Sequence, residues 1–396
     1  MATRTRAAAL GAACSLALGL AIAAAAAPGS GVRVGGLERG HAASVLFVSA
    51  LAVAFLIYLA ALNVLRRNNV PARWVCVFAL VIQLLPLAGP LLLSRDVYSY
   101  WAYARIAADH HRDPYVVPPA RFPHDPATNV VAPGWRGTTS VYGPGFTAGS
   151  IAVDRVAGNS PERAGLIFRT TAALAAVAAT LLAARIARRK AFAAAFIGWN
   201  PLLAISFAGG GHNDSWMLLL MLGALALALE RRDLAAGGVW MLAAAIKIPA
   251  LLLLGLQLAR GRPRIWVGSA VAAVAGSIAA TVAFGDGWLG SLLQLGNRES
   301  RYALPVRLEH FGVPDPVAHA LALIALAAGG IWLVRHALRG RPRLGLAACL
   351  LVLTSPWLLP WYATWPVALA AVEDDAVAQV LALSTAAYLL PSRIPF

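Results

Sequence analysis

The chain is poor in charged residues, and this scarcity excludes most soluble classes of protein. Only 13% of its 396 residues are charged, whereas 60% are hydrophobic, and the mean hydropathy is +0.69. Repeated runs of about 20 apolar residues are typical of transmembrane helices. The runs lack the alternation over about ten residues that marks an outer-membrane barrel. The predicted class is therefore an all-α polytopic membrane protein, since helices satisfy their own backbone hydrogen bonds in lipid.

Cysteine and lysine are also scarce. The three cysteines, Cys14, Cys76 and Cys349, lie inside apolar runs without CxxC spacing, which is typical of small buried residues rather than of a metal or redox centre. Lys190 and Lys247 are the only lysines among 33 basic residues. This bias, together with abundant alanine, indicates a bacterial chain from a GC-rich genome.

The acids are outnumbered, so the net charge is +16 and the sequence pI is about 10.9. The basic residues come in short clusters between apolar runs, which is the positive-inside pattern of cytoplasmic turns. No basic stripe interleaved with aromatics marks a soluble domain, so nucleic acid is not expected as a partner. The expected surroundings are a lipid bilayer, and the expected location is the bacterial plasma membrane.

The apolar runs predict one integral membrane domain over residues 1–396, with about 12 to 13 helices at about 20 residues a span. Two polar loops, 94–163 and 285–314, are expected on the extracytoplasmic side. The first run resembles a signal peptide but is long for one, so we expect a retained helix. The predicted apolar segments are 7–27, 42–65, 72–93, 164–187, 191–207, 215–229, 234–258, 265–284, 315–334, 344–359, 362–372 and 376–390.

Segment 234–258 has arginines before and after it, so the positive-inside pattern places both its ends in the cytoplasm. Lys247-Ile248-Pro249 lies near its middle, and proline breaks the helical hydrogen-bond ladder. We predict a hairpin of two short helices with Lys247 near the extracytoplasmic tip. The alternative is a single kinked helix with inverted topology downstream. With the hairpin, both polar loops and the turns GGGHND and PWLLPWY all face outside.

Candidate chemistry gathers in the loop 94–163. Asp96, Ser99, Tyr100 and Tyr103 have helical spacing, so a helix over 97–108 would present Asp96 with the two tyrosines. Asp96 can be a catalytic acid at a helix mouth, or it can simply cap the helix. The remaining candidates for substrate binding are Arg105, Trp135, Arg136, Tyr142, His212, Asn213, Asp214, Lys247, Arg298, Arg301, Trp361 and Tyr362.

Each of these candidates has a plainer alternative. The turns around Trp135 and Tyr142 can line a sugar site or merely anchor a loop. His212 has no second His or Cys at ligand spacing, so no metal site is predicted, and its neighbours can cap a helix or bind a hydroxyl-rich ligand. Lys247 would cost about 2.5 to 3.5 kcal/mol at the bilayer centre. It can snorkel to the surface or meet a lipid-borne phosphate.

Five stretches together resemble a known family: DVYSYWAYARIAADHHRDPY, PGWRGTTSVYGP, GGGHND, AIKIPAL and PWLLPWY. They are similar to actinobacterial polyprenyl-phosphate-mannose-dependent alpha-1,6-mannosyltransferases, integral membrane enzymes of the GT-C class. The resemblance covers roughly 72–396. It departs from many GT-C enzymes because the loop acid follows the third apolar run, so the first two helices are treated as additions. In a further departure from the family, no C-terminal soluble domain is expected.

The resemblance implies a GT-C-like bundle and an inverting transfer of mannose from polyprenyl phosphate to a hydroxyl of a cell-envelope glycan or glycolipid. A lipomannan-type alpha-1,6 linkage is the expected product. The family's general base carries over to Asp96, and cationic side chains are expected near the leaving phosphate. Because the donor is already activated, no cofactor is expected.

Two other functions compete with this one. A lipid-linked sugar flippase or another transporter would use a broken helix such as the one at Lys247. The long acidic and aromatic loop and the lack of an internal repeat argue against it. A non-enzymatic scaffold would leave Asp96 and Lys247 without a purpose.

Overall fold

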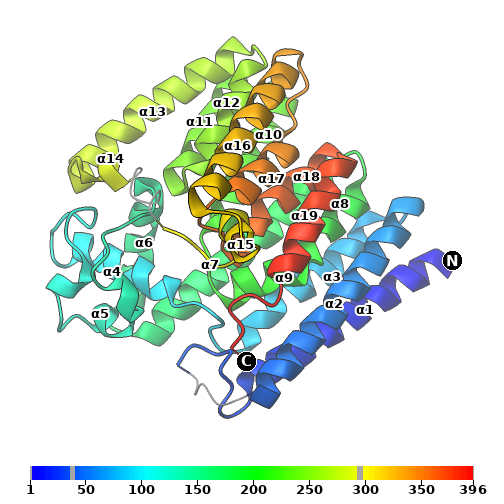
Figure 1. Cartoon of the computed structure of the whole chain (residues 1–396), viewed down its shortest axis with the longest axis horizontal. Coiled ribbons are helices and arrows are strands. Elements are labelled where there is room, and N and C mark those ends of the chain that lie inside the picture. Colours follow the sequence, from blue (N-terminus) through cyan, green and yellow to red (C-terminus); the bar gives the residue numbers. More distant parts are fainter. Residues whose placement is uncertain (1, 36–40, 292–297, 396) are drawn as a thin grey trace. The chain divides into compact units, whose positions relative to one another are not determined.

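The computed structural model describes residues 2–35, 41–291 and 298–395, and this part of the chain is helical (Figure 1). The only strand-like pairing within it is an isolated bridge between Arg33 and Leu92. The all-α class predicted from the apolar runs is confirmed. Residues 292–297 of the predicted second loop lie outside the described residues.

Five helices are long and apolar enough to cross a membrane, which confirms a polytopic membrane protein. They are α1 (Ala2–Ala26), α2 (His41–Arg67), α7 (Pro161–Ile186), α13 (Pro263–Phe284) and α16 (Asp315–Leu338). A sixth candidate is the pair Lys190–Gly198 and Pro201–Gly209, bent by 51°. Other apolar helices are shorter, so 12 to 13 crossings stay a prediction.

The remaining helices are short, and several begin at proline, whose missing N–H would be unbonded in a first turn anyway. They are α3 (Ala72–Leu84), η1 (Leu85–Ala88), α4 (Asp96–Ala108), η2 (Pro119–Arg121), α5 (Pro126–Val130), η3 (Pro133–Trp135), α6 (Pro144–Ala157), α8 (Lys190–Gly198), α9 (Pro201–Ala204), η4 (Ile205–Gly209), α10 (Asp214–Leu229), α11 (Asp233–Ile246), α12 (Pro249–Ala259), α14 (Gly287–Ser291), α15 (Leu304–His310), α17 (Leu344–Thr354), η6 (Pro360–Ala363), α18 (Thr364–Glu373) and α19 (Ala376–Leu389).

Segment 234–258 is broken into α11 and α12, and the chain reverses direction between them. Lys247 is the extended residue after α11, with φ −157° and ψ 132°, and Pro249 begins α12. Arg262, just beyond α12, forms an ion pair with Asp233 at the start of α11, at 2.9 Å. Because this pair joins the outer ends of the two helices, the predicted hairpin is confirmed, and the single kinked helix is wrong.

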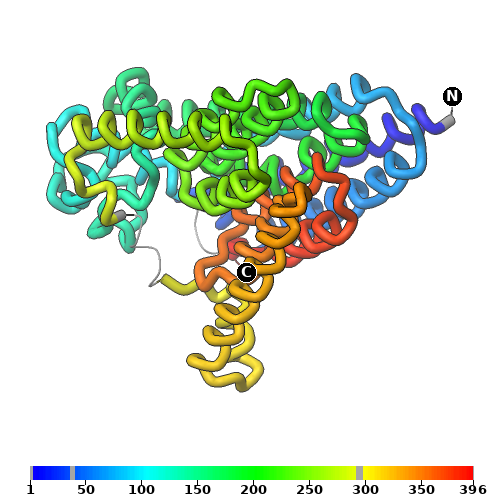
Figure 2. Tube along the Cα trace, turned by 90° about the horizontal axis from the view of Figure 1, so that it is seen from above, coloured from blue at the N-terminus to red at the C-terminus, as the bar shows by residue number. Residues whose placement is uncertain are grey.

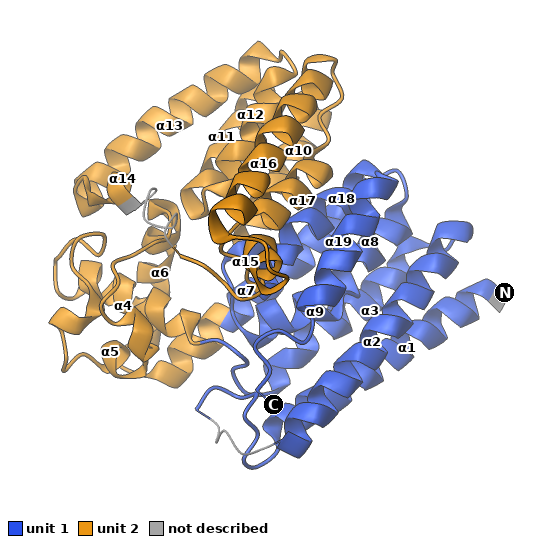
Figure 3. Cartoon of the chain, viewed as in Figure 1, with its two compact units in different colours: residues 1–94, 169–215, 360–396 blue, residues 95–168, 216–359 orange. Residues whose placement is uncertain are grey.

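Contacts gather in two compact units, shown in different colours in Figure 3. Unit 1 comprises residues 1–94, 169–215 and 360–396, and unit 2 comprises 95–168 and 216–359. Two of the four boundaries fall inside helices, in α7 and α10, so no linker separates the units at those positions. The single membrane domain expected over the whole chain stays a prediction.

In unit 1, α1 and α2 lie side by side (Figures 1 and 2), and small side chains let neighbouring helices approach closely. Buried Cys14 on α1 directs its thiol to carbonyl oxygens of Ala54 and Trp199, at 3.7 and 3.8 Å. Cys349 is buried and Cys76 half-buried, and all three are unbridged. The prediction of small buried cysteines is confirmed.

In unit 2, α13 and α16 turn most of their apolar side chains outward. Only 17% of the most apolar window of α13 and 11% of that of α16 is buried inside the protein. In lipid such faces are at no disadvantage, because acyl chains are as apolar as the side chains themselves. These two helices therefore have the composition of lipid-facing spans.

Candidate active site

The loop that follows residue 94 begins with α4, and Asp96 is the first residue of that helix. Arg95 occupies the N-cap position and makes no side-chain capping hydrogen bond. The helix over 97–108 predicted from the spacing is confirmed, but the reading of Asp96 as its cap residue is wrong. The half-buried carboxylate lies in the first turn, where the helix dipole favours negative charge.

One face of α4 carries buried tyrosines, as the spacing predicts. The Tyr100 ring packs edge-on against Tyr142, Phe146 and Phe168, with centroid distances of 4.8, 4.8 and 5.4 Å. Tyr103 contacts Tyr142 with centroids 6.2 Å apart. These aromatic contacts fix the orientation of α4, and with it the position of Asp96.

Tyr103 and Arg298 meet at Thr138, a residue that the sequence analysis did not single out. The Tyr103 hydroxyl donates to the carbonyl oxygen of Thr138 at 2.9 Å, and Nη2 of Arg298 donates to Oγ1 of Thr138 at 3.1 Å. The Arg298 guanidinium also lies over the Trp135 ring, 4.1 Å from its centroid. We call Asp96, Tyr103, Trp135, Thr138 and Arg298 the loop cluster.

Electrostatic interactions act on Tyr103 from two other members of the loop cluster, Asp96 and Arg298. Burial raises the pKa of the Tyr103 phenol, the Asp96 carboxylate raises it further, and Arg298 opposes both effects. An acid and a cation therefore act on the same hydroxyl. Because the phenol stays neutral, it can donate a hydrogen bond beside a carboxylate that can accept a proton.

The turn after Tyr142 brings this loop to Lys247. The backbone N–H of Gly143 donates to the Ile246 carbonyl oxygen at 3.2 Å. A Cβ atom at Gly143 would collide with the Ala245 carbonyl oxygen, so the close approach requires glycine. The turn at Tyr142, which can line a sugar site or anchor a loop, therefore packs on the end of α11. There it lies next to half-exposed Lys247.

Arg105, a predicted substrate ligand, instead bonds protein carboxylates. Its guanidinium bonds Asp125 at 2.9 and 3.0 Å, Asp109 at 3.0 Å and Asp154 at 3.4 Å. Burial alone would lower the pKa of Arg105, but Asp125 and the other two acids outweigh this and raise it. We call these four residues the Arg105 network, and its visible role is to hold the loop together.

Asp125 is the centre of that network. It is buried, and it accepts hydrogen bonds from Arg105, from Nε2 of His110 at 2.8 Å and from the backbone N–H of Ala127 at 2.8 Å. Burial would raise the pKa of Asp125, but the bonds from Arg105 and His110 lower it below its usual value. A carboxylate held in this way is a poor proton acceptor, which makes Asp125 a weaker candidate base than Asp96.

Two other predicted substrate ligands, Arg136 and Arg301, contact residues that are near them in the sequence. Arg136 donates to the carbonyl oxygens of Asn129 and Val131, at 2.9 and 3.3 Å. Exposed Arg301 contacts Tyr302, with a 2.5 Å hydrogen bond and the guanidinium 4.8 Å from the ring centroid. Substrate contacts by Arg105, Arg136 and Arg301 stay predictions.

The other candidates lie in unit 1, where His212 of the GGGHND turn contacts Trp361 of the PWLLPWY turn. The His212 ring stacks on Trp361 with centroids 3.5 Å apart. Trp365, which the sequence analysis missed, donates from Nε1 to Oδ1 of Asp214 at 2.5 Å and stacks on Tyr362 at 4.5 Å. We call His212, Asp214, Trp361, Tyr362 and Trp365 the tryptophan cluster.

Asn213, between His212 and Asp214 in the chain, is only 1% exposed. Within the described residues neither atom of its amide has a hydrogen-bond partner. An unsatisfied buried amide costs about 1 to 3 kcal/mol, so such a group is retained where something else can satisfy it. This observation favours the ligand interpretation of the GGGHND turn over simple helix capping.

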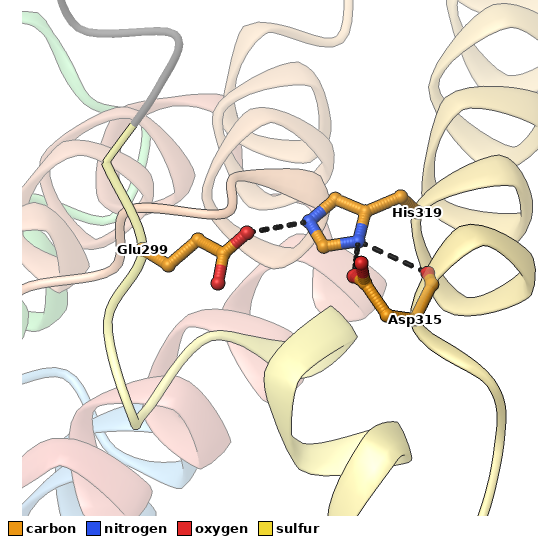
Figure 4. Close-up of side chains that lie close together, drawn as sticks. All are labelled: Glu299, Asp315 and His319. Atoms are coloured by element: carbon orange, nitrogen blue, oxygen red, sulfur yellow. Dashed lines mark hydrogen bonds and ion pairs between the residues drawn. The ribbon is translucent and has the colours of Figure 1, made fainter.

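One group of acid and histidine side chains in the described part of the chain has the spacing of a metal site (Figure 4). Nδ1 of His319 lies 2.7 Å from Asp315, and Nε2 lies 3.4 Å from Glu299. The two carboxylates face different ring nitrogens, and both acids are exposed. The arrangement is that of an ion pair tying residue 299 of the second loop to α16.

Three residues with contacts at these clusters, Thr138, Trp365 and Arg393, have little in their local sequence to mark them as candidates. Thr138 lies inside the PGWRGTTSVYGP stretch, but a threonine in a turn gives no sign of its partners. Trp365 follows the PWLLPWY motif and could have been added to it. Arg393, whose guanidinium lies 5.2 Å from the Trp361 ring centroid, is near the end of the chain in no recognisable pattern.

The chain resembles proteins of known name. The family model for the N-terminal domain of alpha-(1→6)-mannopyranosyltransferase matches residues 5–260. The match includes the first two helices, so the expectation that they are additions to the family pattern is wrong. Alpha-(1→6)-mannopyranosyltransferase A of Mycobacterium tuberculosis is 28% identical over 75% of this chain and 66% of its own length. The protein of that name in Corynebacterium glutamicum is 30% identical over 48% of this chain and 38% of its own length.

A probable alpha-(1→6)-mannopyranosyltransferase of Mycolicibacterium smegmatis is 27% identical over 71% of this chain and 62% of its own length. The chain thus spans at most about two thirds of these relatives. No solved structure gives a significant match. Since the family model covers more than half of the chain, this protein belongs to the alpha-(1→6)-mannopyranosyltransferase family.

Proposed function

We propose that this protein is an inverting glycosyltransferase that moves mannose from polyprenyl phosphate to a hydroxyl of a cell-envelope glycan or glycolipid. Membership of the family supports mannosyl transfer. The observation that carries the mechanism is the half-buried Asp96 in the first turn of α4, electrostatically coupled to Tyr103, on which Arg298 also acts. An alpha-1,6 linkage fits the names of the relatives, and a lipomannan-type product is what the resemblance of the loop motifs implies.

In this mechanism Asp96 accepts the proton of the acceptor hydroxyl while the acceptor oxygen attacks the anomeric carbon. The new C–O bond forms as the bond from the anomeric carbon to the phosphate oxygen breaks. Polyprenyl phosphate leaves with the bonding electrons, and its charge is stabilised by cations. Lys247 and Arg298, both in unit 2, are the candidates for this role.

The proposed location is the bacterial plasma membrane, with Asp96 on the extracytoplasmic side. The positive-inside rule places the turns with basic clusters in the cytoplasm, which leaves the 94–163 loop on the opposite side. Single cysteines placed beside residues 96, 212, 247 and 360 provide the test. An impermeant thiol reagent should label all four from outside in intact cells. Labelling of the 94–146 segment only from the cytoplasmic side would reverse this topology.

The alternative function is a lipid-linked sugar flippase, which the broken α11–α12 hairpin at Lys247 favours. Proteoliposomes containing radiolabelled polyprenyl-phosphate-mannose and a mannoside acceptor separate the two functions. We expect labelled mannose to appear in the acceptor. Movement of intact donor between leaflets without sugar transfer would support the flippase and overturn the enzyme.

A further inference from the structure

A basic cavity in unit 1 plays no part in the proposed transfer. Two turns line it, one between α2 and α3 and the other between α7 and α8, and its volume is about 510 Å³. Its cationic side chains are Arg66, Arg67, Arg188, Arg189 and Lys190. The positive-inside pattern accounts for arginines at such turns, but it does not require two clusters far apart in the sequence to line one cavity.

The protein provides few acidic partners for these cationic side chains. Arg189 lies 3.3 Å from the carboxylate of Asp374. For the other four, the described residues supply no ion-pair partner. All five are exposed, and like charges gathered in this way repel unless an anion lies between them. The cavity therefore has the charge of an anion-binding site.

An apolar cavity adjoins the basic one. It measures about 190 Å³ and shares Arg66 and Phe192 with its neighbour. Leu59 and Leu62 of α2 line it, together with Leu383 of α19. The two adjoining cavities, which we together call the joined cavity, therefore have a cationic end and an apolar end. Since α2 is a candidate span that ends at Arg66 and Arg67, the cationic end has the position of lipid headgroups.

We propose that this joined cavity binds an anionic phospholipid. The phosphate lies among the arginines, and part of an acyl chain lies against Leu59, Leu62 and Leu383. A free phosphate would contact only the cationic end, whereas a phospholipid would also cover the adjoining apolar surface. Basic pockets between membrane helices on the cytoplasmic side are suited to such headgroups.

Binding is tested with the full chain in a neutral detergent, by native mass spectrometry and by titration with spin-labelled phosphatidylglycerol and phosphatidylcholine. We expect a clear preference for phosphatidylglycerol. The variant Arg66→Gln/Arg67→Gln/Arg188→Gln should weaken its binding roughly a hundredfold at low salt, since each basic residue contributes about fivefold. A matched control, Arg335→Gln/Arg339→Gln/Arg341→Gln, removes three exposed arginines from another basic cluster and should change binding less than about threefold.

A second variant tests the apolar end without touching the charge. Leu383→Trp fills part of the small cavity, so it should weaken binding of the diacyl lipid while leaving binding of glycerol phosphate unchanged. Three results would overturn the proposal: equal binding of the two lipids by the wild-type protein, full displacement of the lipid by inorganic phosphate, or equal losses in the two triple variants. The first two need no variant, so a misfolded variant does not prevent a decision.

Discussion

The loop cluster of unit 2 and the tryptophan cluster of unit 1 satisfy their polar groups differently. In the loop cluster an acid and a guanidinium act on the same phenol, and Asp96 stays half-buried. In the tryptophan cluster, aromatic rings enclose the polar groups, and the amide of neighbouring Asn213 has no partner in the described residues. The first arrangement is suited to proton transfer at an accessible carboxylate. The second is suited to a ligand that supplies hydrogen bonds in a dry place.

The Arg105 network adds a contrast within unit 2. Asp125 and Asp96 are carboxylates of the same loop, yet Asp125 is buried among donors, whereas Asp96 is half-buried in the first turn of α4. Residue type alone does not separate a structural acid from a candidate base. Their surroundings do, and the following substitutions test each part of that comparison.

The largest effect is expected for Asp96→Asn. Asparagine keeps the size of the side chain but cannot accept the proton, so the transfer rate at saturating substrates should fall about 100- to 10,000-fold. Glu162→Gln, which removes an exposed acid of α7, is the control and should leave the rate within about threefold of wild type. An initial rate for Asp96→Asn within about threefold of wild type would remove Asp96 as the base.

Asp125→Asn should affect stability rather than chemistry. Removing one partner of a buried ion pair typically destabilises a protein by about 3 to 5 kcal/mol, and the side chains of Asp125 and Arg105 are only 4% and 11% exposed. The free energy of local unfolding of residues 95–168, measured by amide exchange, should fall by about 3 kcal/mol. Glu162→Gln, an exposed acid, should change it by less than about 1 kcal/mol. A loop as stable as wild type would contradict this role.

The lowered pKa of Asp125 also predicts the direction of a pH effect. A carboxyl group whose pKa is lower in the folded protein stabilises the fold above its unfolded value of about 3.9. That contribution is lost as the pH falls through the lower folded value. Amide exchange of the loop should therefore report a stabilisation that survives at pH 5 and disappears in stronger acid in wild type, but is absent from Asp125→Asn at either pH.

Lys247→Met tests whether the tip of the α11–α12 hairpin meets the donor. Methionine keeps the length and removes the charge, and a hydrogen bond to a charged group contributes about 1.5 to 3 kcal/mol. The apparent KM for the lipid-linked donor should rise roughly ten- to a hundredfold, while kcat changes less and the amount of folded protein is unchanged. Unchanged donor kinetics would leave Lys247 as a snorkelling side chain.

The smallest loss of activity is expected for Asn213→Leu, but with an opposite change in stability. Loss of one neutral hydrogen bond to a ligand should lower kcat/KM roughly two- to tenfold. Removing an unsatisfied buried amide should raise the thermal unfolding temperature. Gln83→Leu is the matched control, because the buried Gln83 amide donates to two carbonyl oxygens and its loss should lower that temperature. A lower unfolding temperature for Asn213→Leu would mean that the Asn213 amide has hydrogen-bond partners in the protein itself, which would contradict this prediction.

The sequence by itself determined the class, the helix that begins at Asp96 and the hairpin at Lys247. These features depend on local patterns: apolar runs of bilayer length, helical spacing, and a proline between basic clusters. Such patterns can be recognised in the sequence because, in a bilayer, each segment must satisfy its own backbone hydrogen bonds.

Tertiary structure alone decided which polar groups bond to one another. Nothing near Arg105 in the sequence indicates that Asp125 and Asp154 will enclose it, and nothing near His212 selects Trp361 as its stacking partner. These contacts join residues 20 to about 150 positions apart, and local periodicity carries no information on such pairs. The same holds for Gly143, whose lack of a side chain is explained only by the approach of α11. The composition names the groups that can do chemistry, and the packing decides which of them remain accessible for it.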